Sequence, residues 1–261
     1  MRHVSAENEP KNLCVPLATQ DERRNQLWHT FATATIAKSE GAFFLISAAH
    51  SFADKGGKPA YIFFGREPIS LANCVVLKND EIDIAAIKLS GSIVDKLDDN
   101  VLFVTSAHLN INTPIEGVRE LEAIQFPSDS RSIVSGYPWN RNTMKTRMHN
   151  IGTNGLNITA IDISPSFLGD DNYNELIHIA LCYNEKECFD DSGKKISPRN
   201  LQGTSGGPIT ERTSHGRRGF FRIRGIFQRR DKARRALLGL RYEVILAWLS
   251  MYGQRFPQPT D

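Results

Sequence analysis

The sequence predicts an all-β fold made of two units of similar size, followed by one C-terminal helix. Short runs rich in apolar and β-branched residues recur along the chain, and clusters of Gly, Asn, Asp and Lys separate them. Short strands at close spacing, without long amphipathic patterns between them, are typical of all-β barrels and sandwiches. A polar connector over about residues 110–129 divides the runs into two sets, and 261 residues are enough for two small cores.

The first β unit is expected over residues 26–115, after a polar arm over residues 1–25 that ends in a short helix. Its clearest feature is a hairpin, in which the run 31–37 and the apolar run 42–46 flank a polar bend. The other strands of this unit are expected at residues 60–64, 74–78, 82–89 and 101–104.

The second β unit is expected over residues 130–236, and a helix over residues 237–255. The strands of the second unit are expected at residues 132–136, 158–163, 175–182, 207–209 and 219–227. Apolar residues then recur at three- and four-residue spacing from Leu240 to Tyr252, and Gly253 follows. This spacing, ended by a glycine, predicts a helix that packs one face against the body of the protein.

The composition and the charge of the chain exclude several classes of protein. Apolar residues make up 40% and charged residues 23%, the balance of a folded globular protein rather than of a disordered or collagen-like one. The net charge is only +3, but residues 212–241 carry ten Arg and one Lys against one acid, Asp231. That stretch of +10 leaves −7 for the rest of the chain.

The basic stretch has three interpretations: a solvated strand face, attraction of acidic protein substrates, or binding of nucleic acid. Residues 219–227 have the pattern of a strand with Arg222 and Arg224 on one face and Phe221 and Ile223 on the other, which favours the solvated face. The aromatic residues among these charges have the pattern of core residues, so a nucleic-acid partner is disfavoured.

The cysteines and the chain ends bear on cofactors and location. The four cysteines are Cys14, Cys74, Cys182 and Cys188. Their spacing is irregular, so we expect free thiols rather than disulfides. His178 and Cys182 fall on one face of a predicted strand with Cys188 beyond, but this zinc signal is weak, and we expect neither a metal nor another cofactor.

Without a secretory signal or an apolar run of about 18 residues, a cytoplasmic protein with no membrane partner is expected.

Three short motifs stand in order along the chain. His50 directly follows a buried strand, Asp83 opens an apolar strand, and Ser205 lies in the run Gly-Thr-Ser-Gly-Gly-Pro at residues 203–208. Taken alone, a histidine there is more often a strand-end residue and an aspartate a turn residue, whereas a plain turn does not require three glycines around one serine. Together, in the order His, Asp, Ser, they predict a nucleophilic triad.

At these motifs the sequence resembles the chymotrypsin/trypsin-like serine protease superfamily, over roughly residues 30–230. The run Ile-Val-Ser-Gly-Tyr-Pro at residues 133–138 is also similar to the strand that opens the family's second barrel. The resemblance implies two six-stranded antiparallel β-barrels with a cleft between them. His50 and Asp83 from the first barrel and Ser205 from the second would meet in that cleft.

The chemistry of these residues agrees with the resemblance. A serine hydroxyl is a poor nucleophile at neutral pH, so Ser205 needs a base such as His50 within hydrogen-bond reach. Asp83 would accept a hydrogen bond from the other ring nitrogen of His50 and fix its tautomer. The N–H groups of Gly203 and Ser205 would bind the oxyanion of the tetrahedral intermediate.

Three positions depart from the secreted members of the family. The cysteines expected after His50 and before Ser205 are replaced by Ser51 and Leu201, which agrees with a reducing compartment. The acid that pairs with a newly cut N-terminus is replaced by Thr204. We therefore expect constitutive activity, or control by a regulatory protein partner or by ordering of the oxyanion loop.

The resemblance places the base of the substrate pocket at Arg199 and its wall at Gln228, Arg229 and Arg230. A preference for Lys or Arg is disfavoured, because the acid that would pair with such a side chain is absent. Arg199 and Arg230 could instead prefer an acidic residue before the scissile bond. The alternative is that both face solvent and that the pocket is small or blocked.

These observations predict a serine endopeptidase that cleaves protein or peptide substrates through an acyl-enzyme on Ser205. The alternative is a catalytically silent binding or regulatory module that keeps the protease fold. The altered pocket wall allows this alternative, whereas the complete triad argues against it.

Overall fold

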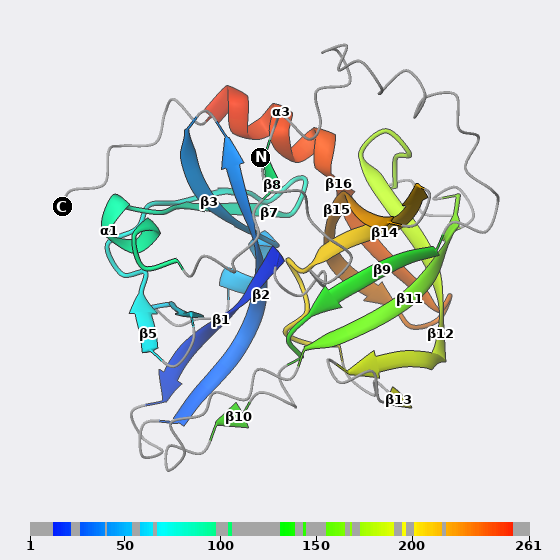
Figure 1. The fold of residues 1–261 in the computed structure, drawn as a ribbon, viewed down its shortest axis with the longest axis horizontal. Helices are drawn as coiled ribbons and strands as arrows, with labels where there is room; N and C mark the ends of the chain where they lie inside the picture. Colours follow the sequence, from blue (N-terminus) through cyan, green and yellow to red (C-terminus); the bar gives the residue numbers. More distant parts are fainter. Residues whose placement is uncertain are drawn as a thin grey trace.

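The computed structural model describes most of the two predicted β units. The described residues are 13–21, 27–39, 41–53, 58–64, 67–97, 104–105, 131–138, 143–144, 155–164, 168, 173–190, 195–196, 201–215 and 218–252. The predicted connector over residues 110–129 and residues 1–12 of the predicted arm lie outside them. Two β-sheets lie side by side, and the helix α3 (Tyr242–Tyr252) lies across the junction between them (Figure 1).

The first sheet is built around the hairpin that the sequence predicts. Its strands, ordered β5-β4-β1-β2-β3-β7-β6, are β1 (Cys14–Asp21), β2 (Leu27–Ser39), β3 (Ala42–Ser47), β4 (Tyr61–Phe64), β5 (Glu67–Ser70), β6 (Val76–Asn79) and β7 (Ile84–Lys88). Two short strands, β8 (Val104–Thr105) and β10 (Thr143–Met144), pair with β2 beside this path, and the short helix α1 (Gly91–Val94) follows β7. The hairpin of β2 and β3 pairs Lys38 with Phe43 and Ser39 with Ala42.

Strand β2 presents two buried faces of different character. Ala32, Ala34 and Ile36 are fully buried in the core of the first unit. Successive side chains of a strand point to opposite faces, so Thr33 and Thr35 point away from that core. Both threonines are nevertheless fully buried. The second face of β2 is therefore covered by another part of the molecule, and its hydroxyl groups need hydrogen-bond partners there.

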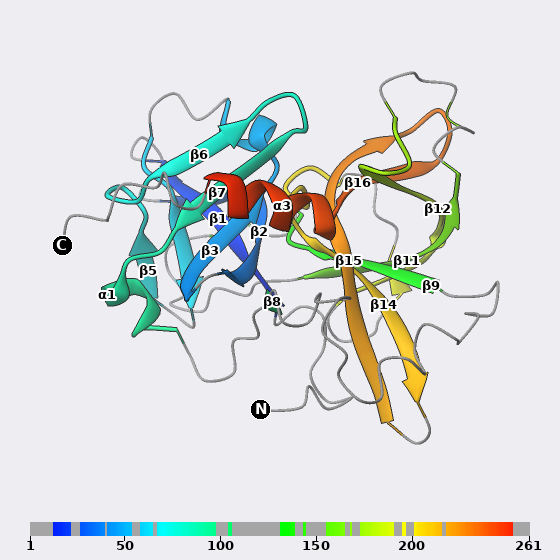
Figure 2. The same cartoon turned by 90° about the horizontal axis from the view of Figure 1, so that it is seen from above.

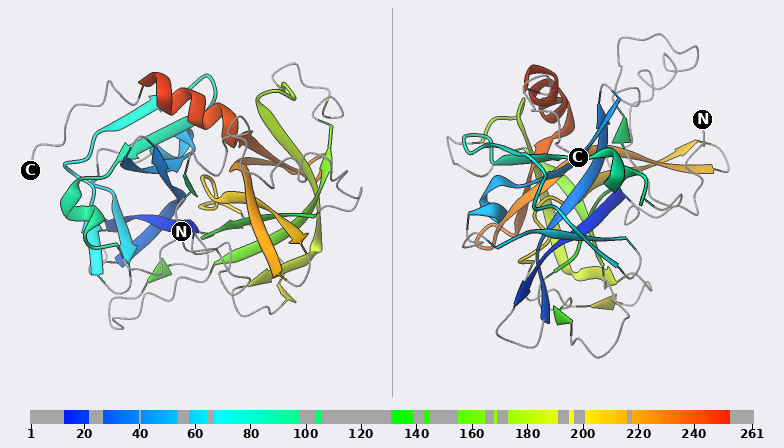
Figure 3. Two further views of the ribbon diagram at one scale, coloured as in Figure 1. Left: turned by 45° about the horizontal axis from the view of Figure 1, so that its top comes forward. Right: turned by 90° about the vertical axis from the view of Figure 1, so that its left-hand side faces the viewer.

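The second sheet closes into a barrel (Figure 3). Its strands, ordered β11-β9-β14-β15-β16-β12-β13, are β9 (Arg131–Gly136), β11 (Leu156–Ile163), β12 (His178–Asp190), β13 (Lys195–Ile196), β14 (Pro208–His215), β15 (Arg218–Asp231) and β16 (Ala236–Arg241). An additional pairing of β11 with β12 joins the ends of the path β11-β9-β14-β15-β16-β12, so these six strands form a closed barrel. The run expected to open the second unit forms β9, and the barrel core contains Val134, Leu181, Ile209 and Phe227.

The C-terminal helix packs on the body, as its apolar spacing predicts. Tyr242, Ile245, Trp248 and Leu249 of α3 are buried. They share one apolar cluster with strands of both sheets; its other fully buried members include Ala37, Ile46, Ile84, Ala86, Ile226 and Leu240. Figure 2 shows α3 lying over the junction of the two units. No helix in the described part of the chain is both long and apolar enough to span a membrane.

Several sequence predictions differ from the structure. Residues 14–21, expected in the arm, form β1, because their apolar side chains pack into the first core and pair with β2. The short helix expected before Trp28 is also wrong where the chain is described, since β2 already begins at Leu27. The helix begins at Tyr242 rather than 237, because residues 236–241 form β16 between β15 and β12. In the described residues, the first sheet runs from β5 to β6, an arrangement consistent with the predicted two-barrel fold.

Candidate active site

The register of the first sheet brings His50 beside Asp83. His50 lies in a short 3₁₀ helix, η2 (Ala49–Phe52), which begins just after β3 ends. Asp83 is the last residue before β7. Strands β3 and β7 are antiparallel, with Ser47 opposite Ala85, so the end of one strand meets the start of the other. Two motifs that are 33 residues apart in the sequence therefore come into contact.

The Asp83 carboxylate binds both the backbone and the ring of His50. Its Oδ2 lies 2.8 Å from Nδ1 of His50, and its Oδ1 lies 3.0 Å from the same nitrogen. The backbone N–H of His50 donates to Oδ1 at 2.9 Å. A carboxylate only accepts hydrogen bonds, so Nδ1 carries the proton and the lone pair of a neutral ring is on Nε2. The His50 side chain is half exposed and the Asp83 side chain is 29% exposed.

Ser205 lies in a loop whose backbone requires glycine on both sides. Gly203 has φ of +94° and Gly206 has φ of +92°, values that residues other than glycine rarely adopt. Between them, Thr204 closes a turn by donating from its N–H to the Leu201 carbonyl at 3.1 Å and from its hydroxyl to the same oxygen at 2.5 Å. Thr204, which replaces the family's acid, is thus satisfied within the loop.

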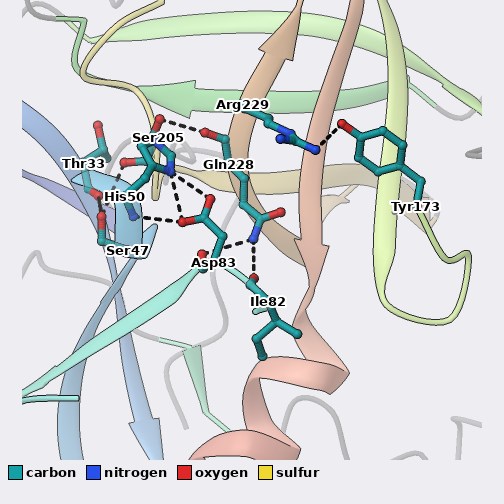
Figure 4. Close-up of polar contacts among 9 residues, drawn as sticks. All are labelled: Thr33, Ser47, His50, Ile82, Asp83, Tyr173, Ser205, Gln228 and Arg229. Carbon is teal, nitrogen blue, oxygen red and sulfur yellow. Dashed lines mark hydrogen bonds and ion pairs between the residues drawn. The ribbon is translucent and has the colours of Figure 1, made fainter. Parts of the chain in front are cut away.

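The Ser205 hydroxyl lies at the junction of the two units (Figure 4). It donates to the backbone carbonyl of Gln228 in β15 at 2.8 Å, and the residue His50 contacts Ser205. Within the described residues, the N–H groups of Gly203 and Ser205 have no protein acceptor. The three predicted catalytic side chains thus lie together, with the serine proton directed to Gln228 rather than to His50.

The polar face of β2 holds the nucleophile loop in place. The Thr33 N–H donates to the Ser205 carbonyl at 3.0 Å, and its hydroxyl donates to the Gly203 carbonyl at 2.8 Å. The Thr35 hydroxyl donates to the Gly206 carbonyl at 2.8 Å. Sequence reasoning missed these residues. Their signal is two threonines, two residues apart, within a run of buried alanines.

Comparison with solved structures finds serine proteases. The HtrA-type protease AlgW with a tripeptide is 12% identical, with a TM-score of 0.51, and the match covers 94% of this chain and 61% of AlgW. The serine protease domain of the Sesbania mosaic virus polyprotein is 11% identical, with a TM-score of 0.47 and coverage of 90% and 91%. An inactive serine-to-alanine mutant of Rv3671c from M. tuberculosis H37Rv is 14% identical, with a TM-score of 0.48 and coverage of 97% and 94%.

The chain has the chymotrypsin-like serine protease fold. The closed second barrel, the flanking first sheet and the C-terminal helix agree with this fold, and the predicted all-β class is confirmed. No model of a known protein family matches the sequence, and no curated protein matches it either.

In this chymotrypsin-like fold, the four predicted pocket residues have different environments. Arg199 lies outside the described residues. Gln228 is only 5% exposed, and its side-chain amide donates to the backbone carbonyls of Ile82 and Asp83. The place of Gln228 in a pocket wall stays a prediction, and its side-chain amide is engaged by the other unit. Arg230 lies over the ring of Tyr183, 5.1 Å from its centroid.

Arg229 is an exposed cation that follows Gln228 in β15. Its Nη2 donates to the Tyr173 hydroxyl at 2.5 Å, and its guanidinium lies 5.1 Å from the centroid of the same ring (Figure 4). It has no carboxylate partner within the described residues. The His178 ring packs edge-on against Tyr173, with ring centroids 5.7 Å apart. Burial lowers the pKa of His178, the hydrogen bond from the Asn174 N–H raises it, and the charge of Arg229 lowers it further. Arg229 is therefore fixed in position with its charge unpaired.

Two further arginines of the basic stretch, Arg224 and Arg234, have carboxylate partners in the described part of the chain. Arg224 donates to Asp162 at 2.6 Å and to Ser132 at 2.8 Å, and Arg234 pairs with Asp231. The four cysteines form no disulfide in the part of the chain that the structure describes. Among the same residues, no group of three or more His, Cys, Asp or Glu side chains is arranged to hold a metal ion.

Proposed function

We propose that this chain is a serine endopeptidase that hydrolyses peptide bonds through Ser205, His50 and Asp83. The proposal rests on one observation above all: Asp83 binds Nδ1 of the His50 ring at 2.8 Å, and His50 also contacts Ser205. Such a ring can take a proton at Nε2 and be stabilised as imidazolium at Nδ1. The chymotrypsin-like fold agrees with the proposal.

In the proposed reaction, the Ser205 Oγ attacks the scissile carbonyl carbon while its proton passes to Nε2 of His50. The N–H groups of Gly203 and Ser205 stabilise the oxyanion, and His50 then protonates the leaving amine as the C–N bond breaks. Water hydrolyses the acyl-enzyme by the same steps. Because the resting hydroxyl donates to Gln228, the first step requires a rotation of the Ser205 side chain toward His50.

The strand beside Ser205 offers a surface for an extended substrate. On one side of β15, the pairing with β14 ends at Ile226, which lies opposite Pro208. On the other side, the pairing with β16 continues to Asp231. Residues 229–231 therefore have a neighbouring strand on one side only within the described sheet. An extended peptide that adds to this side would lie next to Ser205.

Labelling with a fluorophosphonate, which reacts with activated serines, tests the proposal. We expect the wild-type chain to be labelled and Ser205→Ala not to be labelled, because Ser205 is the serine that His50 contacts in the described part of the chain. Ser92→Ala, at an exposed serine in helix α1, is the matched control and should label like the wild type. A folded wild-type chain that never labels would instead support the catalytically silent module.

Substrates with an acidic residue near the scissile bond should be cleaved in preference to neutral ones. Arg229 is held by Tyr173 without a carboxylate partner, so a substrate carboxylate can form a charge-assisted hydrogen bond with it. Arg229→Gln should lower the ratio of kcat/KM for a Glu-containing peptide over its Gln analogue about tenfold. The control Arg234→Gln should leave the ratio unchanged, because Arg234 already pairs with Asp231. A peptide library that shows a preference for Lys or Arg would contradict this prediction.

A further inference from the structure

We propose that Gln228 is a positioning residue that acts on both ends of the triad. Its side chain holds the turn that carries Asp83, and its backbone carbonyl holds the hydroxyl of Ser205. The catalytic consequence rests on the proposed function, whereas the structural role does not. Figure 4 shows Gln228 between the two catalytic groups, with its amide directed to Asp83 and its carbonyl to Ser205.

The Gln228 amide binds both peptide groups that flank Asp83. Its Nε2 donates to the carbonyl of Ile82 at 2.7 Å and to the carbonyl of Asp83 at 3.1 Å. The first carbonyl belongs to the peptide before the Asp83 Cα and the second to the peptide after it. Two donors on one amide nitrogen therefore restrain the backbone on both sides of the catalytic carboxylate.

Asp83 needs this restraint because its backbone is strained. It has φ of +51°, in the left-handed region that residues other than glycine rarely occupy. Such a conformation persists only when its surroundings hold it. On the β6 side of the turn, the Asn79 side chain accepts hydrogen bonds from the N–H groups of Glu81, at 3.0 Å, and Ile82, at 3.4 Å. Asn79 thus binds N–H groups of the turn, whereas the carbonyls of Ile82 and Asp83 are bound by Gln228.

A bulge in β15 turns Gln228 toward the other unit. Phe227 lies opposite Gly239 and Arg229 lies opposite Leu238, so the register shifts at Gln228. A bulge of this kind re-aims the extra residue away from the regular ladder. Here it directs both the side chain and the carbonyl of Gln228 across the junction, where the side chain is 5% exposed. A buried amide that makes two such bonds is costly to replace by a group without donors.

The two functions of Gln228 can be separated by experiment. A side-chain substitution removes the bonds to Ile82 and Asp83 but keeps the backbone carbonyl that accepts the hydrogen bond from the Ser205 hydroxyl. Gln228→Met has nearly the same length and no donor. Gln20→Met, at a half-buried position on β1 away from the site, is the matched control.

For Gln228→Met we expect kcat to fall about 10- to 100-fold with KM changed less than about twofold, because the carboxylate is displaced while substrate binding is retained. In an Asp83→Asn background, the same substitution should have no further effect, since Gln228 acts through Asp83. Gln228→Asn, which keeps the amide on a shorter side chain, should lose less activity than Gln228→Met. Gln20→Met should match the wild type throughout.

A second measurement does not depend on catalysis. The NMR resonance of the proton between His50 Nδ1 and Asp83 should shift in Gln228→Met and stay in place in Gln20→Met. If the wild type never reacts with a fluorophosphonate but this resonance shifts, the positioning role holds and the proposed function fails. A folded Gln228→Met with an unchanged resonance overturns the positioning role, as does a raised KM with unchanged kcat. If Gln228→Met does not fold, the same measurements on Gln228→Asn decide.

Discussion

Replacing either His50 or Ser205 by alanine is expected to lower kcat by about 10⁶-fold for any peptide that the chain cleaves. The serine cannot attack efficiently without a base, and the base has no catalytic role without the serine. The two losses should therefore not add: the double variant His50→Ala/Ser205→Ala should be no slower than either single variant. Single-turnover kinetics on one peptide substrate, with all variants shown to be folded, measure this.

Asp83→Asn should have a smaller effect, about 10⁴-fold in kcat, because it leaves the serine and the base present but favours the wrong tautomer of His50. Its matched control is Asp80→Asn, an exposed acid at the start of the same turn, which should retain activity. Losses that add in the double variant, or equal losses at Asp80 and Asp83, would contradict a triad. Equal losses at Asp80 and Asp83 would show that the contact between His50 and Asp83 serves structure rather than catalysis.

The parts of the fold that could be predicted depend on neighbours in the sequence. The hairpin of β2 and β3 follows from the run 31–37 and the apolar run 42–46 on the two sides of a polar bend, where Gly41 has φ of +81°. The motifs at His50, Asp83 and Ser205 were visible for the same reason, since each consists of adjacent residues with specific backbone needs. The helix α3 was predicted from its apolar spacing.

The boundary between β16 and α3 shows the limit of such patterns. Leu237, Leu238 and Leu240 are buried, and the same apolar residues are compatible with a strand or with the first turn of a helix. The choice is made by the strands β12 and β15, which pair with these residues on both sides. Pairing partners that lie far away in the sequence cannot be inferred from local spacing.

The contacts that build the site are longer in range still. The Thr33 hydroxyl binds the carbonyl of a residue 170 positions away, and the Gln228 amide binds one 146 positions away. No local pattern predicts these bonds, which exist only once the two units have packed together. For this reason the sequence reveals the residues that carry the chemistry but not those that hold them, and Gln228 was assigned to a pocket wall instead.

Gly206→Ala is expected to abolish stable folding, because the nucleophile loop packs directly against the first sheet. A Cβ atom at this position would lie 2.1 Å from the Thr33 carbonyl oxygen and 2.8 Å from the Ser47 Cα, so backbone would have to move. The peptide there is also tied in place, since the Gly206 N–H donates to the Phe227 carbonyl at 2.6 Å and its own carbonyl accepts from Thr35. We expect the free energy of unfolding to fall by more than about 4 kcal/mol, a large part of the stability of a typical domain.

The control for this prediction is Gly41→Ala, which separates backbone strain from collision. Gly41 has φ of +81°, close to the +92° of Gly206, but a Cβ atom there would meet nothing within 4 Å. Its substitution should therefore cost only the left-handed backbone penalty, about 1–2 kcal/mol. Urea unfolding measures the free energy of unfolding of both variants. If Gly206→Ala does not fold, it will be absent from the soluble folded fraction, which also supports the prediction. Equal destabilisation of the two variants would mean that the loop can move away from β2 at little cost, and that the hydrogen bonds from Thr33 and Thr35 do not lock the two units together.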